Sequence, residues 1–445
     1  MAALQALGTE LIARDRWSRD EILAFQRARL SDLLAHAVEA SPYYRETIGP
    51  ITGPVELEQL PTLPKRVLID EFDQIVTDQR IRLDELEAHL ASGDSADLYL
   101  DSYRAFSTSG TSGLRALIVY SQEEFAQWIA TSLRLFARIG ITPQTRLVAI
   151  GAPNPLHITR QLFAAFRSGR SGTPDLSVLT PVDEIVDALN AYQPEAVLGY
   201  ASIAALLAEE QLRGRLEIRP RIVGVSAEVL TDEARRAIKQ AWNIEPTQVY
   251  ASTEVLYLAS SEPPHRDLHT YDDLVIVEVV DEGNRRVPAG RPGYKVLVTN
   301  LVNRTQPLIR YELSDSVTVP EGPDPAGLPY GRLARIDGRS DDILELPGRD
   351  GRTVAVHPYR LRAPFAALRD VRQYQIVHAG DRLEVKIVLQ PDAAHETVAR
   401  VHAETRAALD EAGALGPALE VVVVDSIGRE SGHAAKLKLI KRLGP

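Results

Sequence analysis

Hydroxyl and glycine residues are concentrated in one short segment of the chain, FSTSGTSGLR (106–115). Glycine has no Cβ, so backbone N–H groups can approach an anion closely, and the hydroxyls add further hydrogen-bond donors. The segment is therefore a candidate phosphate-binding loop. It lacks the G-x-x-x-x-G-K-[ST] pattern of a Walker loop, and similar clusters are common in polar surface turns. Its candidate ligands are Ser107, Thr108, Ser109, Gly110, Thr111, Ser112 and Gly113.

An acidic residue, Glu254, closes the segment YASTE directly after a predicted parallel strand. Ligands of open α/β sheets bind beyond the carboxyl ends of the strands, so a carboxylate at this place is well positioned to hold a metal ion. A single glutamate at a strand end is also typical of a solvated loop charge or a helix cap. Glu254 is thus a candidate metal ligand, and the structural alternative stays open.

Asp315 and Arg339 are the charged candidates in two later segments, PLIRYELSD (307–315) and GRSDD (338–342). A carboxylate can accept hydrogen bonds from both hydroxyls of a ribose, as it does in other nucleotide sites. A guanidinium presents a fixed fork of donors to phosphate or ribose. An ion-pair cluster at a strand edge is the alternative for both residues, so neither segment decides the function by itself.

These candidates need elements that position them, and residues 145 to 255 predict alternating strands and helices. Short apolar runs alternate with helix-like stretches, which is typical of β-α-β units and a parallel sheet. The predicted strands cover 146–151, 196–200, 221–226 and 247–252, and the predicted helices cover 157–168, 181–191, 201–212 and 231–242.

The rest of the chain lies on either side of this core. The first hundred residues are predicted to be helical, and Ser18 and Glu21 have the spacing of a capping box. Residues 274–301 predict an antiparallel pair of strands, and a hairpin at 371–390 begins a separate pattern. We expect an α/β fold with a large N-terminal domain and a small, mobile α+β C-terminal domain. The expected bounds are 1–338 (helical start 1–100, α/β core 101–270, antiparallel part 271–338) and 339–445.

The composition limits the class of protein. The chain has 445 residues, 44% of them hydrophobic and 25% charged, close to the average of soluble globular proteins. A net charge of −11 argues against a general nucleic-acid or anionic-membrane binder. The absence of cysteine excludes disulfides, Cys-based metal sites and thiol catalysis. We expect a cytoplasmic protein with no signal peptide, membrane span or nucleic-acid partner, and a homodimer stays open.

Five segments occur in an order that resembles the adenylate-forming superfamily of acyl-CoA synthetases, luciferases and peptide-synthetase adenylation domains. STSGTSG resembles its phosphate loop, VSAEVL (225–230) its segment beside adenine, and YASTE its segment ending in a magnesium-linked glutamate. PLIRYELSD resembles the ribose-binding stretch, and GRSDD the hinge into a mobile C-terminal domain. With SPYYRE (41–46), which resembles the end of an early helix, the chain is most similar to the phenylacetate–CoA ligase branch.

The resemblance implies a two-step reaction that uses ATP, Mg²⁺ and a thiol, usually that of coenzyme A. A carboxylate attacks the α-phosphate and releases pyrophosphate, and the thiol then displaces AMP from the acyl-adenylate. Thr108 to Gly113 would contact the β- and γ-phosphates, and Glu254 would help hold Mg²⁺. Asp315 would bind the ribose hydroxyls, Arg339 would contact ribose or phosphate, and Asp341 would be the hinge. The other residues carried over to the ATP site are Ser107, Ser226, Ala227, Glu228, Tyr250, Ala251, Ser252 and Thr253.

The C-terminal end departs from the family pattern. Family members end with a Gly-Lys pair whose lysine bridges the carboxylate and the α-phosphate, but a gapless match puts His433 in that place. Lys436 follows three residues later and Lys438 five, in a chain with only seven lysines. We expect Lys436 to be the displaced catalytic lysine, with His433 as the second catalytic candidate and a solvated basic tail as the alternative. In the segment that resembles the phosphate loop, Leu114-Arg115 stands where the family usually has a lysine. The Cys-rich zinc site of some relatives is excluded because this chain has no cysteine.

The acid and the acceptor are the least specified parts. By position, His157 and Tyr200 are expected to line the acyl pocket, although an isolated histidine that opens a helix is more often structural. The branch predicts an aromatic or arylacetic acid and coenzyme A. A separate carrier protein, an amine or another nucleophile such as nitrite are alternative acceptors. A nucleotide-binding sensor that has lost catalysis is the alternative from another class.

Overall fold

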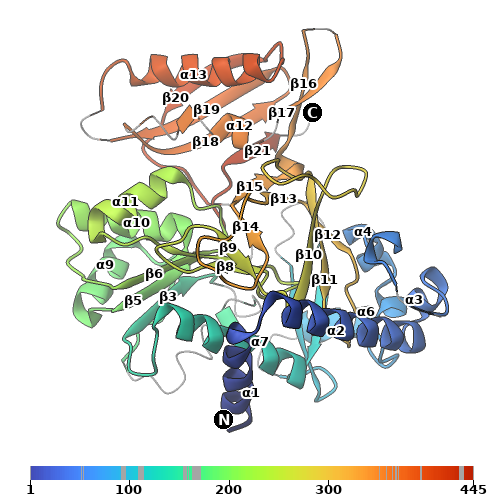
Figure 1. Ribbon diagram of the computed structural model, residues 1–445. Coiled ribbons are helices and arrows are strands. Elements are labelled where there is room, and N and C mark those ends of the chain that lie inside the picture. The colour runs from blue at the N-terminus through green and yellow to red at the C-terminus, as the bar shows by residue number, and fades with distance from the viewer. Residues whose placement is uncertain are drawn as a thin grey trace.

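The computed structural model describes residues 2–443 apart from 52, 54, 92–96, 109–114, 154–157, 159, 163–171, 350, 357, 363, 366–367, 369, 391–392 and 430–434. It shows a mixed α/β protein in which a smaller C-terminal part sits on a large N-terminal part (Figure 1). Parallel and antiparallel sheets are both present. The expected fold class is therefore confirmed.

The centre of the N-terminal part is an eight-stranded sheet with the strand order β14-β9-β8-β7-β6-β5-β3-β4. Strands β3, β5, β6 and β7 run parallel, as the alternating pattern predicts, and the two-residue strand β4, which was not predicted, pairs in parallel with β3. Strands β8, β9 and β14 extend the same sheet with antiparallel pairing, which the sequence pattern did not indicate because strands of two or three residues carry little periodicity. The bounds are β3 Leu147–Gly151, β4 Leu176–Ser177, β5 Ala196–Tyr200, β6 Ile222–Ser226, β7 Thr247–Tyr250, β8 Ala259–Ser261, β9 Leu268–Thr270 and β14 Arg332–Leu333.

Helices cover both faces of this sheet. Successive strand residues point to opposite faces. Val148, Ile150 and Val197 pack in one cluster with side chains of α9 and α10, and Leu147 and Ile222 pack in another with Phe136 of α7. The bounds are α7 Gln122–Ile139, α9 Val182–Tyr192, α10 Ala201–Leu212 and α11 Asp232–Trp242. The last three confirm the predicted helices to within one residue.

The N-terminal helices pack beside the antiparallel strands (Figure 1). The predicted capping box is confirmed, because the Ser18 side chain accepts from the Glu21 N–H and the Glu21 carboxylate accepts from the Ser18 N–H. The helical bounds are α1 Ala2–Ala13, η1 Arg14–Arg16, α2 Arg19–Ala40, α3 Pro42–Thr47, η2 Leu57–Gln59, α4 Lys65–Asp70, α5 Phe72–Ile75 and α6 Leu83–Ala91. The remaining strands are β1 Tyr103–Ser107, β2 Leu117–Ser121, β10 Val275–Val280, β11 Lys295–Asn300, β12 Tyr311–Leu313, β13 Asp315–Thr318 and β15 Arg335–Arg339. The expected antiparallel pair within 274–301 is β10 with β11.

The C-terminal part has a hydrophobic cluster of its own, in which Ile376, Val385 and Ile387 of the sheet pack with Val401 and Leu409 of α13. Its main sheet has the order β20-β19-β18-β21, and the predicted hairpin is β18 with β19. The bounds are η3 Ser340–Asp342, β16 Leu344–Pro347, β17 Thr353–Val356, α12 Pro358–Arg362, β18 Val371–Ala379, β19 Arg382–Leu389, α13 Thr397–Glu411, β20 Ala418–Val423 and β21 Ile440–Leu443. A separate core is typical of a separate domain, and the boundary between 338 and 339 stays a prediction.

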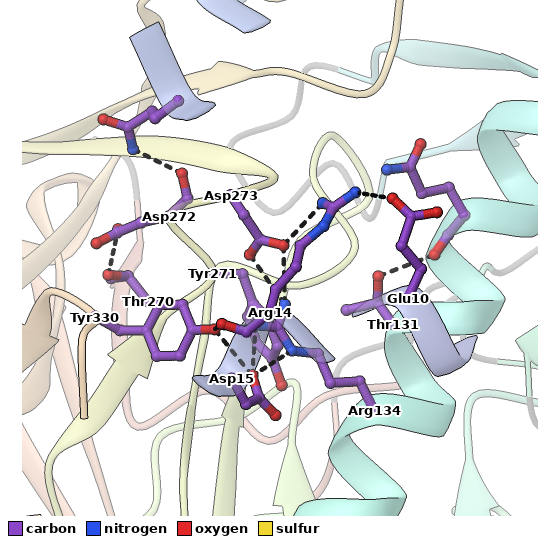
Figure 2. A network of polar contacts seen from close by, with 12 residues as sticks. Glu10, Arg14, Asp15, Thr131, Arg134, Thr270, Tyr271, Asp272, Asp273 and Tyr330 are labelled. Carbon is purple, nitrogen blue, oxygen red and sulfur yellow. Dashed lines mark hydrogen bonds and ion pairs between the residues drawn. The ribbon is translucent and has the colours of Figure 1, made fainter. Parts of the chain in front are cut away.

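A buried network of charges joins the N-terminal helices to the body of the protein (Figure 2). Arg14 and Arg134 both donate to Asp273, with N–O distances of 3.0 and 2.9 Å, and the side chains of Arg134 and Asp273 are completely buried. Asp15 accepts from Arg134 at 2.7 Å and from the Tyr330 hydroxyl at 2.9 Å. An unpaired buried charge is costly, so these groups depend on one another. The network therefore holds η1 against α7.

Arg138 extends this network from Asp15 to Glu262, whose carboxylate lies 3.1 Å from the guanidinium. Glu262 also contacts His269 Nδ1 at 2.8 Å, and Asp324 contacts His269 Nε2 at 3.1 Å. Burial disfavours the charged imidazole, but the hydrogen bonds and charges of the two carboxylates outweigh burial and raise the pKa of His269. The charged ring is therefore favoured in the folded protein.

Among the residues that the structure describes, none of the helices combines the length and the apolar character that crossing a bilayer requires.

Candidate active site

A cavity of about 760 Å³ lies at the carboxyl ends of β5, β6 and β7. The loops after these strands form one wall, and β12, β13 and β15 form another. Residues 436–440 of the C-terminal part complete the lining. Segments more than 200 residues apart in the sequence therefore meet at the edge of the sheet where open α/β proteins bind their ligands.

Glu254 follows β7 and is 6% exposed. Its backbone carbonyl accepts from the Tyr120 hydroxyl at 2.8 Å and from Asn300 Nδ2 at 3.0 Å, so the loop is tied to two neighbouring strands. Its Oε1 accepts from the Tyr311 hydroxyl at 3.0 Å. Burial, together with the charge of Glu254, raises the pKa of Tyr311 well above its ordinary value, so this hydroxyl stays a donor at neutral pH. Tyr311 thus orients the carboxylate.

The residues around Glu254 suit Mg²⁺ that arrives with a nucleotide. Within the described part of the chain, no three acidic or histidine side chains form a group that would hold a metal ion by themselves. Mg²⁺ in nucleotide enzymes is usually bound by one or two carboxylates together with substrate phosphates and water. A single oriented carboxylate that lines the same cavity as Thr108 fits that requirement.

Asp315 and Arg339 are brought together by strand pairing, because they are Cα partners in the antiparallel pair of β13 and β15. Arg339 Nε lies 3.3 Å from Asp315 Oδ1, and the Tyr250 hydroxyl donates to Asp315 Oδ2 at 2.9 Å. Each carboxylate oxygen has a second lone pair, so Asp315 keeps acceptor capacity for two hydroxyl groups. Gly338, with φ of +130°, precedes Arg339, and a Cβ at this position would lie 2.8 Å from Pro358. Both its conformation and its surroundings therefore require glycine.

The segment after β6 forms a tight turn on the cavity wall. Ala227 has φ of +67°, and the Glu228 N–H donates to the Ser226 carbonyl at 2.8 Å. A non-glycine residue in this conformation is strained, and such strain persists where the surroundings hold it. Glu228 Oε2 accepts from the Ser202 N–H at 2.9 Å, which links the turn to the start of α10. The turn is therefore held at a defined place in the cavity.

The candidate phosphate loop is the connection of a hairpin, since β1 pairs with β2 through Ser107 and Leu117. Two further contacts close its base: the Thr108 N–H donates to the Ala116 carbonyl at 2.9 Å, and the Ala116 N–H donates to Thr108 Oγ1 at 3.0 Å. Ser109, Gly110, Thr111, Ser112 and Gly113 lie outside the described residues.

Lys65, at the start of α4, is a site residue that the sequence analysis did not select. Its Nζ donates to Thr108 Oγ1 at 3.2 Å, and both residues line the cavity. Lys65 therefore brings an ammonium group from another element to the base of the candidate phosphate loop. The scarcity of lysine in this chain was the only sequence signal that pointed to it.

Lys436 enters the cavity from the C-terminal part and lies among Arg339, Glu228, Asp315 and Glu254. Burial, followed by the charge of Arg339, lowers the pKa of Lys436 to about 8, and the three carboxylates oppose that effect. Lys438 instead has its Nζ 3.3 Å from Asp342 Oδ1. Of the two lysines, Lys436 is therefore the one placed among the candidate ATP-site residues.

The acyl-pocket candidates are less well placed. Tyr200 packs in the buried cluster of Val148, Ile150 and Leu189, and it is absent from the described lining of the cavity, so its position does not support the predicted role. His157 and His433 lie outside the described residues, as does the side chain of Asp341. The sequence analysis missed the apolar end of the cavity, which is lined by Leu135, Phe136, Ile139, Ile158 and Leu162.

Comparison with known proteins agrees with this arrangement. The chain is 26% identical over 383 residues to phenylacetate–coenzyme A ligase of Thermus thermophilus, a match covering 81% of this chain and 78% of the relative. It is 25% identical over 450 residues to phenylacetate–coenzyme A ligase of Escherichia coli, covering 96% and 97%. No protein-family model matches the chain.

Among solved structures, 2-hydroxyisobutyryl-CoA ligase in the postadenylation state is similar, with a TM-score of 0.73 at 20% identity, covering 96% of this chain and 90% of that one. The same ligase in the thioesterification state gives a TM-score of 0.58. Sequence and fold together confirm the resemblance to the adenylate-forming superfamily and to its phenylacetate–CoA ligase-like branch.

Proposed function

We propose that this protein is an ATP-dependent, AMP-forming ligase that activates a carboxylic acid and transfers the acyl group to coenzyme A. In the first step a carboxylate oxygen bonds to the α-phosphorus of ATP, and the bond from that phosphorus to the bridging oxygen breaks to release pyrophosphate. In the second step the thiol sulfur bonds to the acyl carbon of the adenylate. The bond between that carbon and the phosphate oxygen breaks, AMP leaves, and the thiol proton is released.

The convergence of Lys436 with Asp315, Arg339 and Glu254 in one cavity is the observation that carries this proposal. Displacement at phosphorus depends mainly on positioning the reactants and on neutralising charge. Lys436 supplies a cation for the α-phosphate and the incoming carboxylate, and Asp315 accepts from the ribose hydroxyls. Lys65 and Thr108 contact the β- and γ-phosphates, and Arg339 contacts ribose or phosphate.

Glu254 would hold Mg²⁺ that enters with ATP. When bound, the ion would supply positive charge beside the phosphates. Tyr311 keeps one carboxylate oxygen oriented, so the protein contributes a fixed ligand and the nucleotide contributes the others.

An aromatic or arylacetic acid is the proposed substrate class, because two relatives are named phenylacetate–coenzyme A ligases. The apolar end of the cavity suits a hydrophobic acyl group. Its lining consists of Leu135, Phe136 and Ile139 of α7 together with Ile158 and Leu162, which follow β3. The arrangement of the two parts of the chain favours the adenylation side of the cycle, since the TM-score is higher against the postadenylation structure of the hydroxyisobutyryl-CoA ligase than against its thioesterification structure.

Pyrophosphate release from Mg-ATP tests the proposal. Benzoic, phenylacetic, cinnamic and short aliphatic acids are each supplied with and without coenzyme A, using the wild type, Lys436→Ala and the matched control Lys438→Ala. We expect coenzyme A to accelerate release for one acid class, Lys436→Ala to reduce release to a small residual rate and Lys438→Ala to retain most of it. Release that ignores coenzyme A would keep the adenylation step and direct the search to a carrier protein, an amine or nitrite. ATP binding without release for any acid would contradict the ligase and favour a nucleotide sensor.

A further inference from the structure

The peptide groups on both sides of Lys436 are held by two oppositely charged residues, Glu228 and Arg429. The Leu437 N–H donates to Glu228 Oε1 at 2.7 Å, and Arg429 donates to the Ala435 carbonyl at 3.2 Å. Glu228 and Arg429 also pair directly, with an N–O distance of 3.1 Å. The two side chains therefore form a clamp around the backbone of Lys436, one from the N-terminal part of the chain and one from the C-terminal part.

The clamp is itself anchored to the N-terminal part. The Ser202 N–H donates to Glu228 Oε2 at 2.9 Å, and Arg429 donates to Ser202 Oγ at 2.7 Å. The Glu228 side chain is 5% exposed and that of Arg429 is 18% exposed. Solvent screens this pair little, so removal of one partner leaves the other charge poorly compensated.

Ala435 adds an apolar anchor beside the clamp. It is 3% exposed and packs in the cluster of Val148, Ile150 and Leu189, which belongs to the N-terminal part. Its φ is +46°, in the left-handed region that a residue with a Cβ seldom adopts. Such a conformation persists when the surroundings hold it, and here the clamp and the apolar cluster do so. The residue before Lys436 is thus fixed in both position and conformation.

A second ion pair links the same two parts at another place. Arg372 of β18 pairs with Glu209 of α10, and their side chains are 18% and 10% exposed. Among the described residues, neither Arg372 nor Glu209 hydrogen-bonds to Ala435 or Leu437, so this pair stabilises the interface without holding the backbone of Lys436.

We propose that Glu228 and Arg429 are positioning residues for the adenylation step, holding Lys436 in the cavity while the acid attacks ATP. This inference rests on the proposed function. Neither residue needs to touch the reacting atoms; they act by fixing the carbonyl before Lys436 and the N–H after it. Transfer of a finished acyl-adenylate to the thiol does not require the clamp.

The test measures the two half-reactions separately. Adenylation is followed as single-turnover pyrophosphate release at saturating Mg-ATP and acid, and transfer as thioester formation from a chemically prepared acyl-adenylate and coenzyme A. We expect Glu228→Gln and Arg429→Gln to slow pyrophosphate release by at least about tenfold, and Arg429→Gln to keep thioester formation within about twofold of the wild type. Arg429→Lys should give an intermediate rate, because lysine keeps the charge but not the fork of donors.

Two comparisons separate a positioning role from a general loss of structure. In a Lys436→Ala background, Glu228→Gln should add less than about a twofold further loss, because both changes act through the same group. Glu209→Gln breaks the other interface pair, and it should slow pyrophosphate release clearly less than Glu228→Gln does. Full additivity with Lys436→Ala, an equal effect of Glu209→Gln, or unchanged pyrophosphate release in Glu228→Gln would each overturn the clamp.

Hydrogen exchange supplies a readout that does not depend on catalysis. The amide of Leu437 should be protected in the wild type and should exchange at least about tenfold faster in Glu228→Gln, because its acceptor is weakened. If the two proteins differ in exchange but the wild type releases no pyrophosphate with any acid, the proposed function and the catalytic role of the clamp are contradicted. The clamp would then stand as a structural feature only. Equal exchange in both proteins would refute the clamp itself.

Discussion

Adenylation by this protein should fail in mildly alkaline solution because Lys436 loses its proton there. Burial and the neighbouring charge of Arg339 lower the pKa of Lys436 to about 8, against 10.5 for an ordinary lysine. At pH 7 about 90% of Lys436 then carries its charge, and at pH 9 about 10% does. An ordinary lysine would stay charged at both values, so the expected loss between pH 7 and pH 9 is about tenfold.

The assay is kcat/KM for pyrophosphate release, because this parameter reports the pKa values of the free enzyme. Measurements run from pH 6.5 to pH 9.5 at constant ionic strength, for the wild type and for Lys436→Arg. Arginine stays charged throughout this range, so the variant should be slower but should show no alkaline decline. Glu228→Gln removes a carboxylate that favours the charged lysine, and its decline should begin at a lower pH.

A wild-type profile that stays flat to pH 9.5 would refute this reasoning. It would mean that Asp315, Glu254 and Glu228 hold the proton on Lys436 more strongly than burial and Arg339 remove it. A decline that persists unchanged in Lys436→Arg would assign the titration to another group.

Three further predictions follow from the described contacts. Lys65→Ala should raise the KM for ATP about tenfold in the same assay, because a charge-assisted contact at the phosphate loop is lost, and an unchanged KM would exclude that contact. Asp273→Asn should lower the free energy of unfolding by about 3 kcal/mol in urea titrations, because it leaves buried guanidinium groups without their carboxylate; Asp70→Asn, at an exposed ion pair, should cost less than about 1 kcal/mol. His269 has a raised folded-state pKa, so its contribution to stability is complete below its ordinary value of 6.5 and is lost as pH rises through the raised value. The Tm of the wild type should therefore fall more between pH 6 and pH 8.5 than that of His269→Gln, and parallel declines would contradict this assignment.

Much of the architecture follows from local patterns. The alternation of apolar runs and amphipathic stretches predicts β3, β5, β6 and β7 with their helices, because strand and helix periodicities are properties of neighbouring residues. The same holds for the capping box of Ser18 and Glu21. The same pattern placed Glu254 directly after a parallel strand, and in the structure it follows β7 at the edge where an open sheet binds its ligands.

The identity of the C-terminal lysine could not be decided in this way. Lys436 and Lys438 are two residues apart in the same basic segment, and composition does not distinguish them. Their environments come from distant residues. Glu228 accepts a hydrogen bond from the N–H of Leu437, which lies 209 positions later in the chain, and Asp342 pairs with Lys438. Lys65 reaches the phosphate loop in the same manner, across 43 positions.

The sequence by itself therefore determined the class of fold, the order of its elements and the chemistry that its motifs can perform. The tertiary structure placed Lys436 near Arg339, Glu228, Asp315 and Glu254, paired Lys438 with Asp342, and packed Tyr200 in a buried cluster. The physical reason is the sequence separation over which each kind of interaction acts. Propensity and periodicity act between residues a few positions apart, whereas burial and charge act between groups that only the folded chain brings together.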